Sequence, residues 1–166
     1  MKKEGKTKIK AVVFDVGGVL ELTNYSSRPI HGHRLIGVHT YMAKKFRIDL
    51  DTWFDSIDSA YVDSMQGRIS EQETLQKMSK SLKVSPKKIE RLFIKAYKKY
   101  FRENKKLYKL AFKLKKQGYK IAILSDQWHI SKKALIPEKY SKKFDAVILS
   151  CDVGFRKPNP RIYKLL

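Results

Sequence analysis

Three short apolar runs along the chain each end in polar residues. They lie at residues 9–16, 119–126 and 145–150 and are rich in Val, Ile and Leu. Runs of this length, bounded by turn-forming residues, are typical of strands buried in a parallel sheet. Segments with helical periodicity separate them. We therefore predict an α/β fold with a parallel Rossmann-like sheet in which these three strands are present.

Helical periodicity dominates the long segment between the first two strands. Apolar residues recur at helical spacing over 34–46 and 51–65. Ser70 followed three residues later by Glu73 has the spacing of a capping box, which predicts a helix start. Further helix starts are predicted at Ser85–Pro86, Asn104 and Asn159–Pro160, the last opening a helix that runs to Leu166.

The domain limits follow from these elements. Residues 22–103 are predicted to form a helical cap inserted into the sheet domain, because they are far more than a crossover connection needs. The α/β core comprises residues 8–21 and 104–166, and residues 1–7 form a basic tail. With 166 residues, of which 42% are apolar, the chain can bury a sizeable core.

The chain is strongly basic, with 37 Lys and Arg against 16 Asp and Glu and a net charge of +21. This charge suits a nucleic-acid-binding protein, a reading that predicts affinity falling steeply with salt. Only 8 of the basic residues are Arg, however, and side chains that read bases are predominantly Arg. We therefore do not expect nucleic acid as the partner. A small anionic substrate would also be attracted by this field.

The sequence predicts a cytoplasmic protein. The apolar run after the basic N-terminus is too short for a signal peptide or a membrane span. The single cysteine, Cys151, cannot form an internal disulfide, which fits a reducing compartment. No membrane partner is expected.

Polar residues follow each predicted strand at the point where it ends. Asp15 ends the first strand, Ser125 and Asp126 end the second, and the loop after the third leads to Lys157. The carboxyl ends of parallel strands meet at one edge of the sheet, where ligands bind in open α/β folds. A carboxylate there can act as a nucleophile or metal ligand, a hydroxyl can donate to phosphate, and a lysine can neutralise an anion.

These segments resemble a known family. "FDVGGVL", "IAILSDQ" and "FDAVILSCDVGFRKPNPRIYKLL" resemble the first three motifs of the haloacid dehalogenase (HAD) superfamily, and "GRISEQETLQKMSKSL" is similar to the cap of its phosphatase-like members. The resemblance runs from Lys8 to Leu166. It implies a hydrolase, most simply a phosphomonoesterase that acts on a small phosphorylated metabolite, with the cap as a lid that selects the substrate.

The resemblance also implies roles for single residues. Asp15 would be the nucleophile that forms an aspartyl-phosphate, and Lys157 would neutralise the reacting groups. Mg²⁺ would bind the Asp15 carboxylate and the backbone carbonyl of Gly17. The phosphate-binding residues would be Ser125, Asp126 and Gly18, and the residues just past the second strand that would face the substrate are Gln127, Trp128 and His129.

The sequence departs from the family pattern twice. Gly17 stands where typical members carry a second Asp that acts as general acid and base. The fourth, acidic motif on a later strand is not seen. We therefore expect a chain that is truncated as a domain, with the first strand as an uncovered edge open to self-association and with little Mg²⁺-dependent activity on its own. A non-catalytic HAD-fold module that binds phosphate or a partner is the alternative reading.

Overall fold

A computed structural model describes residues 9–23 and 37–166. Its central sheet consists of the parallel strands β1 (Ala11–Phe14), β4 (Lys120–Ser125) and β5 (Ala146–Leu149), in the order β1-β4-β5. The predicted fold class, a parallel α/β sheet with a helical insertion, is confirmed. The predicted tail 1–7 and the start of the helix expected at 34–46 lie outside the described residues.

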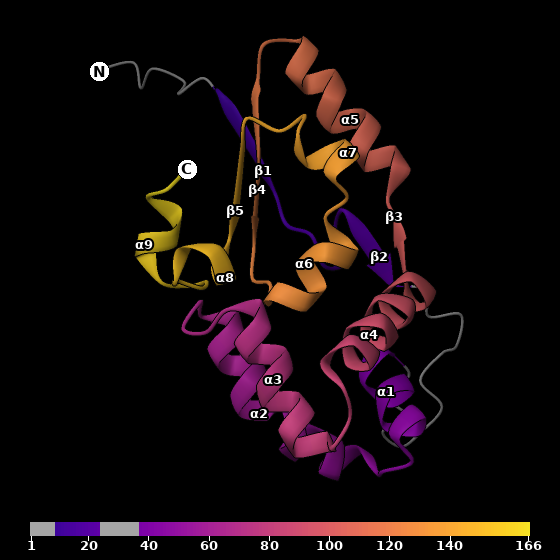
Figure 1. Ribbon diagram of the computed structural model, residues 1–166. Helices are drawn as coiled ribbons and strands as arrows, with labels where there is room; N and C mark the ends of the chain where they lie inside the picture. Colours follow the sequence, from indigo (N-terminus) through magenta and orange to yellow (C-terminus); the bar gives the residue numbers. More distant parts are fainter. Residues whose placement is uncertain (1–8, 24–36) are drawn as a thin grey trace.

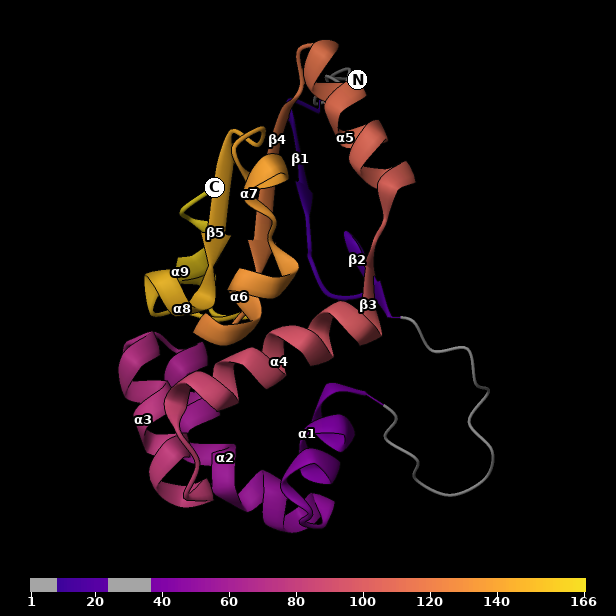
Figure 2. The ribbon, with the colours of Figure 1, turned by 45° about the vertical axis from the view of Figure 1, so that its right-hand side comes forward.

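The helices form two groups, one beyond one end of the sheet and one beside it (Figure 1). The first group is α1 (Val38–Phe46), α2 (Leu50–Met65), α3 (Glu71–Leu82) and α4 (Pro86–Tyr100). The second is α5 (Lys105–Lys116), α6 (His129–Leu135), α7 (Glu138–Ser141), α8 (Ser150–Val153) and α9 (Pro160–Tyr163). Figure 2 shows the first group gathered beyond the carboxyl ends of the sheet strands, so these helices face the edge where the sequence predicts a site.

A short antiparallel ribbon joins the insertion to the sheet domain. Its strands are β2 (Glu21–Thr23) and β3 (Phe101–Glu103). The backbone N–H of Asn104 donates to the carbonyl oxygen of Leu20 at 2.8 Å. This hydrogen bond holds together the two segments that connect the insertion to the sheet domain. The ribbon lies at the two predicted limits of the cap, residues 22 and 103.

Capping residues begin the helices much as the sequence predicts. Ser70 and Glu73 form the reciprocal capping box at the start of α3, with Ser70 N–H donating to Glu73 Oε2 at 2.7 Å. The Asn104 side chain accepts the Leu107 N–H at the start of α5. Ser85 begins α4 ahead of Pro86, but its side chain makes no capping hydrogen bond. At the other end of the chain α9 ends at Tyr163, so the helix expected to run to Leu166 is shorter than predicted.

The two faces of the sheet are packed unequally. Helices α5 to α7 cover one face, where the Phe14 and Phe144 rings meet edge to face with centroids 6.1 Å apart. On the other face α8 and α9 cover only the β4–β5 side, through a small cluster that includes Leu124 and Ile162. Val13 of β1 is therefore 43% exposed, and the expectation of a fully buried first strand is wrong. Among the described strands β1 is an edge, as predicted.

The insertion has its own aromatic core. Trp53 of α2 is fully buried, stacks on Phe46 with centroids 5.8 Å apart and lies 5.7 Å from the Phe93 ring of α4. The described part of the chain contains no helix that is both long enough and apolar enough to cross a membrane.

Candidate active site

The structure brings Asp15, Ser125 and Lys157 together at the carboxyl end of the sheet. Asp15 Oδ1 accepts hydrogen bonds from Ser125 Oγ and from the Val16 backbone N–H, each at 2.7 Å. Asp15 Oδ2 accepts from Lys157 Nζ at 2.8 Å. Ser125 is the last residue of β4, and Lys157 lies in the loop between α8 and α9. Three segments far apart in the sequence thus converge on one carboxylate.

These contacts keep Asp15 ionised. Partial burial acts to raise the pKa of Asp15, but the hydrogen bonds from Lys157, Ser125 and Val16, together with the Lys157 charge, outweigh it and hold the pKa below its usual value. The Asp15 side chain is still 40% exposed. It is therefore a charged carboxylate that a ligand can reach.

Open space adjoins this carboxylate on the glycine side. Within residues 9–23 and 37–166, no atom outside the chain neighbours lies within 4 Å of the position that a Cβ would take at Gly17 or Gly18. Gly18 has a φ of 76°, which favours glycine, and its N–H closes the turn on the Glu21 carbonyl at 2.8 Å. The Asp15 carboxylate and the Gly17 carbonyl are the hard oxygen donors that Mg²⁺ prefers, and the space beside them leaves room for its waters. These residues fit a magnesium ion.

Asp126 holds the loop that delivers Lys157. Its Oδ1 accepts the Lys157 backbone N–H at 3.0 Å, and its Oδ2 lies 3.8 Å from Arg156 Nε. The sequence predicted Asp126 as a phosphate-binding residue. The structure adds a positioning contact that the sequence reasoning did not anticipate, because the contact depends on where a distant loop folds.

A buried relay that the sequence analysis missed orients Ser125. Gln127 Nε2 donates to Ser125 Oγ at 3.1 Å, and Ser131 Oγ donates to Gln127 Oε1 at 2.5 Å. Ser150 Oγ fixes the Gln127 backbone by accepting its N–H at 3.0 Å. Because Gln127 Nε2 donates to the Ser125 oxygen, the Ser125 hydroxyl hydrogen is left to donate to Asp15. Polar residues at Ser131 and Ser150, each amid apolar neighbours, are the signal that could have identified the relay.

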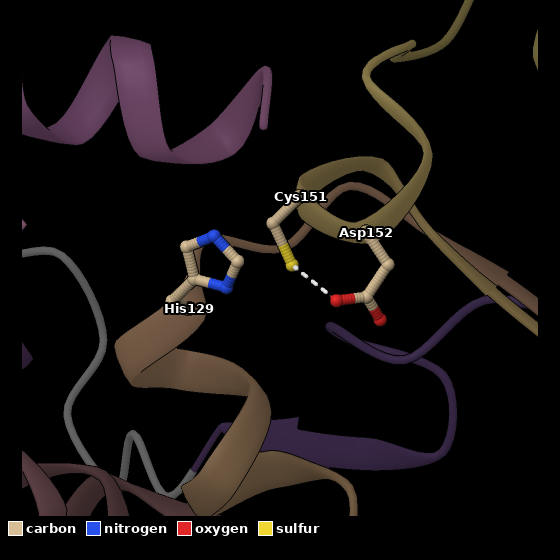
Figure 3. A group of neighbouring side chains, drawn as sticks. All are labelled: His129, Cys151 and Asp152. Atoms are coloured by element: carbon tan, nitrogen blue, oxygen red, sulfur yellow. Dashed lines mark hydrogen bonds between the residues drawn. The ribbon is translucent and has the colours of Figure 1, made fainter. Parts of the chain in front are cut away.

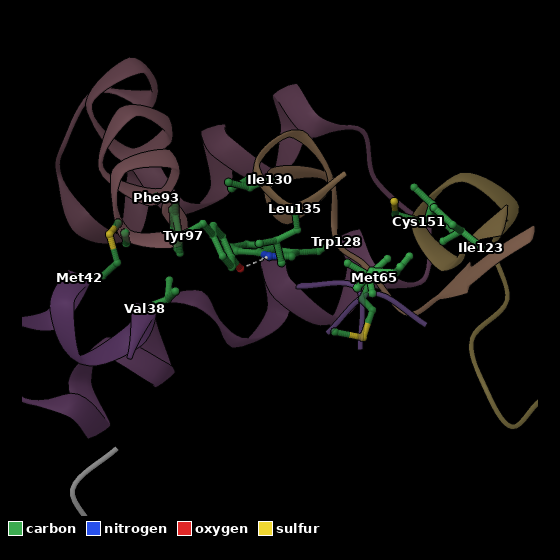
Figure 4. Close-up of a cluster of buried hydrophobic side chains, with 14 of the residues drawn as sticks. Val38, Met42, Met65, Phe93, Tyr97, Ile123, Trp128, Ile130, Leu135 and Cys151 are labelled. Atoms are coloured by element: carbon green, nitrogen blue, oxygen red, sulfur yellow. Dashed lines mark hydrogen bonds between the residues drawn. The ribbon is translucent and has the colours of Figure 1, made fainter. Parts of the chain in front are cut away.

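A cavity of about 210 Å³ lies between the insertion and the sheet domain, next to the Asp15 turn. Gly17, Asp126 and Gln127 line its end on the sheet side. The rest is largely apolar and aromatic, with Tyr61, Tyr97 and Trp128 among its walls. Figure 4 shows Trp128 between Tyr97 and Met65, with the Trp128–Tyr97 hydrogen bond drawn. The cavity therefore adjoins the turn that carries Asp15.

His129 ties the insertion to the sheet domain rather than lining this cavity. Its backbone N–H donates to Ser64 Oγ at 3.1 Å, and its Nε2 lies 3.1 Å from the Ile69 carbonyl oxygen. Both partners belong to the end of α2 and the turn that follows. The expectation that His129 faces a substrate finds no support in these contacts.

His129 also belongs to a cluster with Cys151 and Asp152 (Figure 3). Its ligand-type atoms lie within 4.8 Å of one another. Lys132 Nζ already contacts both Asp152 oxygens, at 2.7 and 3.0 Å. Burial and the Asp152 charge raise the pKa of the Cys151 thiol to about 12, so the thiol stays protonated. The existing partners of the cluster satisfy it without a metal.

Comparison with protein families identifies the class of protein. The family model of the haloacid dehalogenase-like hydrolases matches residues 9–166. The chain belongs to this family, as its motifs predicted. No curated protein matches the sequence significantly.

Solved structures of the family share the fold. A HAD family enzyme from Bacteroides thetaiotaomicron is similar with a TM-score of 0.70 and 21% identity, over 96% of this chain and 77% of that one. Its wild-type complex with magnesium and inorganic phosphate gives a TM-score of 0.68 at 21% identity, over 95% and 77%. A predicted HAD-like family hydrolase from Porphyromonas gingivalis gives 0.66 at 20% identity, over 95% and 74%. At these identities the likeness establishes the fold.

Proposed function

We propose that this HAD-family hydrolase is a phosphomonoesterase that works through an aspartyl-phosphate on Asp15. The observation that carries the proposal is the charged Asp15 carboxylate, held by Ser125 and Lys157 beside open space at the end of the sheet. An Asp15 oxygen attacks phosphorus and the ester P–O bond breaks with its electron pair on the leaving oxygen, which takes up a proton. Water then attacks phosphorus, which releases inorganic phosphate and restores Asp15.

The neighbouring residues supply positioning and charge. Lys157 places an ammonium group 2.8 Å from Asp15, where it can also neutralise phosphoryl oxygens. Ser125 can donate to a phosphate oxygen once substrate competes for its hydroxyl. Asp15 and the Gly17 carbonyl would hold Mg²⁺, which would add positive charge beside the phosphoryl group. The complex of the Bacteroides relative with magnesium and inorganic phosphate supports this assignment.

Gly17 sets a chemical limit on the reaction. It has no side chain to protonate the leaving oxygen, and no side chain in the described part of the chain fills the space beside it. General acid–base catalysis is typically worth about 10²–10⁴-fold in rate. An enzyme without it depends on esters whose leaving oxygen departs readily as an anion.

The test uses 4-nitrophenyl phosphate, whose leaving group needs no proton, with and without Mg²⁺. We expect the Mg²⁺-dependent release of nitrophenol to be slow, as the two departures of the sequence from the family pattern predict, and Asp15→Asn should abolish it, because it removes the nucleophile. Asp55→Asn, the same change at an exposed position of α2, is the control and should leave the rate unchanged. A rate that survives Asp15→Asn would overturn the proposal.

A second candidate, a phosphate-binding module without catalysis, is favoured by Gly17, which stands where typical members of the family carry the general acid and base, and by the fourth motif that the sequence analysis did not find. It predicts that inorganic phosphate binds and that Lys157→Met weakens this binding, while no ester is hydrolysed. Calorimetric titration with phosphate beside the nitrophenol assay separates the two candidates.

A further inference from the structure

The walls of the cavity beside Asp15 are built to receive a flat apolar group. Trp128 is 2% exposed, and three neighbours fix it. Its ring centroid lies 5.0 Å from those of Tyr61 and Phe93, and its Nε1–H donates to Tyr97 Oη at 2.9 Å. A wall locked in this way is already organised before a ligand arrives, which lowers the entropy cost of binding. Aromatic rings pack well against such a surface.

Among the residues that the structure describes, the cavity lining carries no positive charge. None of the described residues lining it is Lys or Arg. Its one carboxylate, Asp126, is engaged by the Lys157 backbone N–H and lies near Arg156. An anionic substituent on the ligand would lose its water beside a carboxylate and aromatic rings, which is costly.

His39 of α1 contributes a neutral donor to the same lining. Burial lowers the pKa of His39, so the imidazole is uncharged at neutral pH. Trp53 Nε1–H donates to His39 Nδ1 at 3.1 Å, which assigns the His39 proton to Nε2. His39 can therefore donate to a hydroxyl or carbonyl oxygen but adds no positive charge.

The size of the cavity limits the group to one ring. A cavity of about 150 Å³ is enough for benzene, and this one measures about 210 Å³. Cavities for drug-sized ligands start near about 300 Å³. One ring with a short uncharged substituent fits, whereas a nucleoside or a fused ring system with substituents is too large.

The chemistry next to the cavity favours the same class of compound. Without a general acid at Gly17, the leaving oxygen must depart as an anion or take its proton from water. A phenol has a pKa near about 10, as the tyrosine side chain does, whereas hydroxyl groups on saturated carbon approach the value of about 15.7 for water. A phenolate is therefore by far the better leaving group.

We propose that the substrate is the phosphate monoester of a single-ring phenol without a further anionic group, bound with its ring against Tyr61, the partly exposed ring of the wall that the buried Trp128 supports from behind. This inference rests on the proposed function. In the transfer, the aryl O–P bond breaks, the electron pair leaves on the phenol oxygen, and the phosphoryl group binds an Asp15 oxygen. The phenolate takes its proton from water after release.

The test compares phenyl phosphate, 4-carboxyphenyl phosphate and ethyl phosphate in the presence of Mg²⁺. The carboxylated phenol is no worse a leaving group than phenol, so chemistry alone would not disfavour its ester. We expect kcat/KM for phenyl phosphate to be at least about tenfold higher than kcat/KM for the carboxylated ester. It should be at least about 100-fold higher than kcat/KM for ethyl phosphate. Equal values for the two aryl esters would overturn the inference.

Tyr61→Ala probes the cavity itself. Tyr61 forms part of the wall. The variant should therefore lower kcat/KM for phenyl phosphate several-fold. It should also hydrolyse biphenyl-4-yl phosphate, which the wild-type protein should reject. Tyr41→Ala is the matched control, because Tyr41 also belongs to the insertion but packs against Tyr100 outside the cavity. A Tyr61→Ala variant with the substrate range of the wild type would contradict the assignment.

Binding of two phosphonates that cannot be hydrolysed separates failure of this inference from failure of the proposed function. Phenylphosphonate should bind at least about tenfold more tightly than 4-carboxyphenylphosphonate in calorimetry. If this preference holds but no ester is hydrolysed, the cavity assignment stands and the phosphomonoesterase proposal fails. If esters are hydrolysed but the phosphonates bind equally, the phosphomonoesterase proposal stands and this inference fails.

Discussion

At Asp15, two opposing effects act on one carboxylate. Burial favours the protonated acid, and the donors from Lys157, Ser125 and Val16 favour the anion. The donors prevail and hold the pKa of Asp15 below its usual value, and Lys157 is the donor that also carries charge. The pKa of the proposed nucleophile is therefore set in part by a residue 142 positions away in the sequence.

Replacing Lys157 should expose this dependence. Lys157→Met removes a charged hydrogen bond, so the pKa of Asp15 should rise, and the acid limb of kcat/KM against pH should move to higher pH. The rate at neutral pH should fall by about 10²–10³-fold, as on loss of a donor to a developing charge. A pH series with 4-nitrophenyl phosphate measures both effects. Lys164→Met, at an exposed lysine, is the control. An acid limb that stays in place would show that Lys157 does not control Asp15.

The β2–β3 ribbon, which connects the insertion to the sheet domain, contains an unusual carboxyl group. Glu21 is 4% exposed and lies opposite Glu103 in the ribbon. The pKa of Glu21 is raised to about 7. Burial is the main cause and the charge of Glu103 adds to it, whereas the hydrogen bond from Tyr108 Oη at 3.3 Å and the charge of Lys139 act to lower the pKa. The folded protein therefore favours the protonated form of Glu21.

The sign of the pH dependence follows from this shift. The folded pKa of Glu21 lies above the ordinary value of 4.5, so the folded state binds the extra proton between these values. The free energy of unfolding should fall as pH rises from about 4.5 to about 7, by an amount of the order of 3 kcal/mol. Glu21→Gln should flatten this slope, and Glu138→Gln, at an exposed position, should not. Urea unfolding at several pH values tests this, and parallel slopes for wild type and Glu21→Gln would contradict it.

Local signals explain which elements the sequence could predict. The apolar runs gave all three sheet strands, and the capping residues gave the starts of α3 and α5. The edge position of the first strand was expected from the family resemblance alone, and the ribbon carries no periodicity long enough to detect. At the site, the motifs placed Asp15, Ser125 and Lys157 at one edge, where the structure has them. The cavity arises from packing between distant helices, which no local pattern encodes.

Over the whole molecule, positive charge collects on solvated helix faces. On α4, five exposed basic residues recur on one side of the helix, opposite its buried apolar face. They are Lys87, Lys88, Arg91, Lys95 and Lys98. On α5 the same spacing recurs in Lys105, Lys106, Lys109, Lys113 and Lys116, all of them exposed. With a net charge of +21, the compact state concentrates like charges that the unfolded chain can spread apart.

This balance predicts that salt stabilises the protein. Raising NaCl from about 0.05 to about 0.5 M shortens the Debye length severalfold and screens the repulsion, whereas the exposed ion pairs that salt also weakens are worth little. The unfolding midpoint should therefore rise by several degrees. Chloride is the right salt, because sulfate stabilises proteins by exclusion whatever their charge. The double variant Arg91→Glu and Lys95→Glu, which removes four units of positive charge from an exposed face, should respond less steeply. A midpoint that falls with salt would show that local ion pairs, rather than the net charge, dominate the electrostatics of the fold.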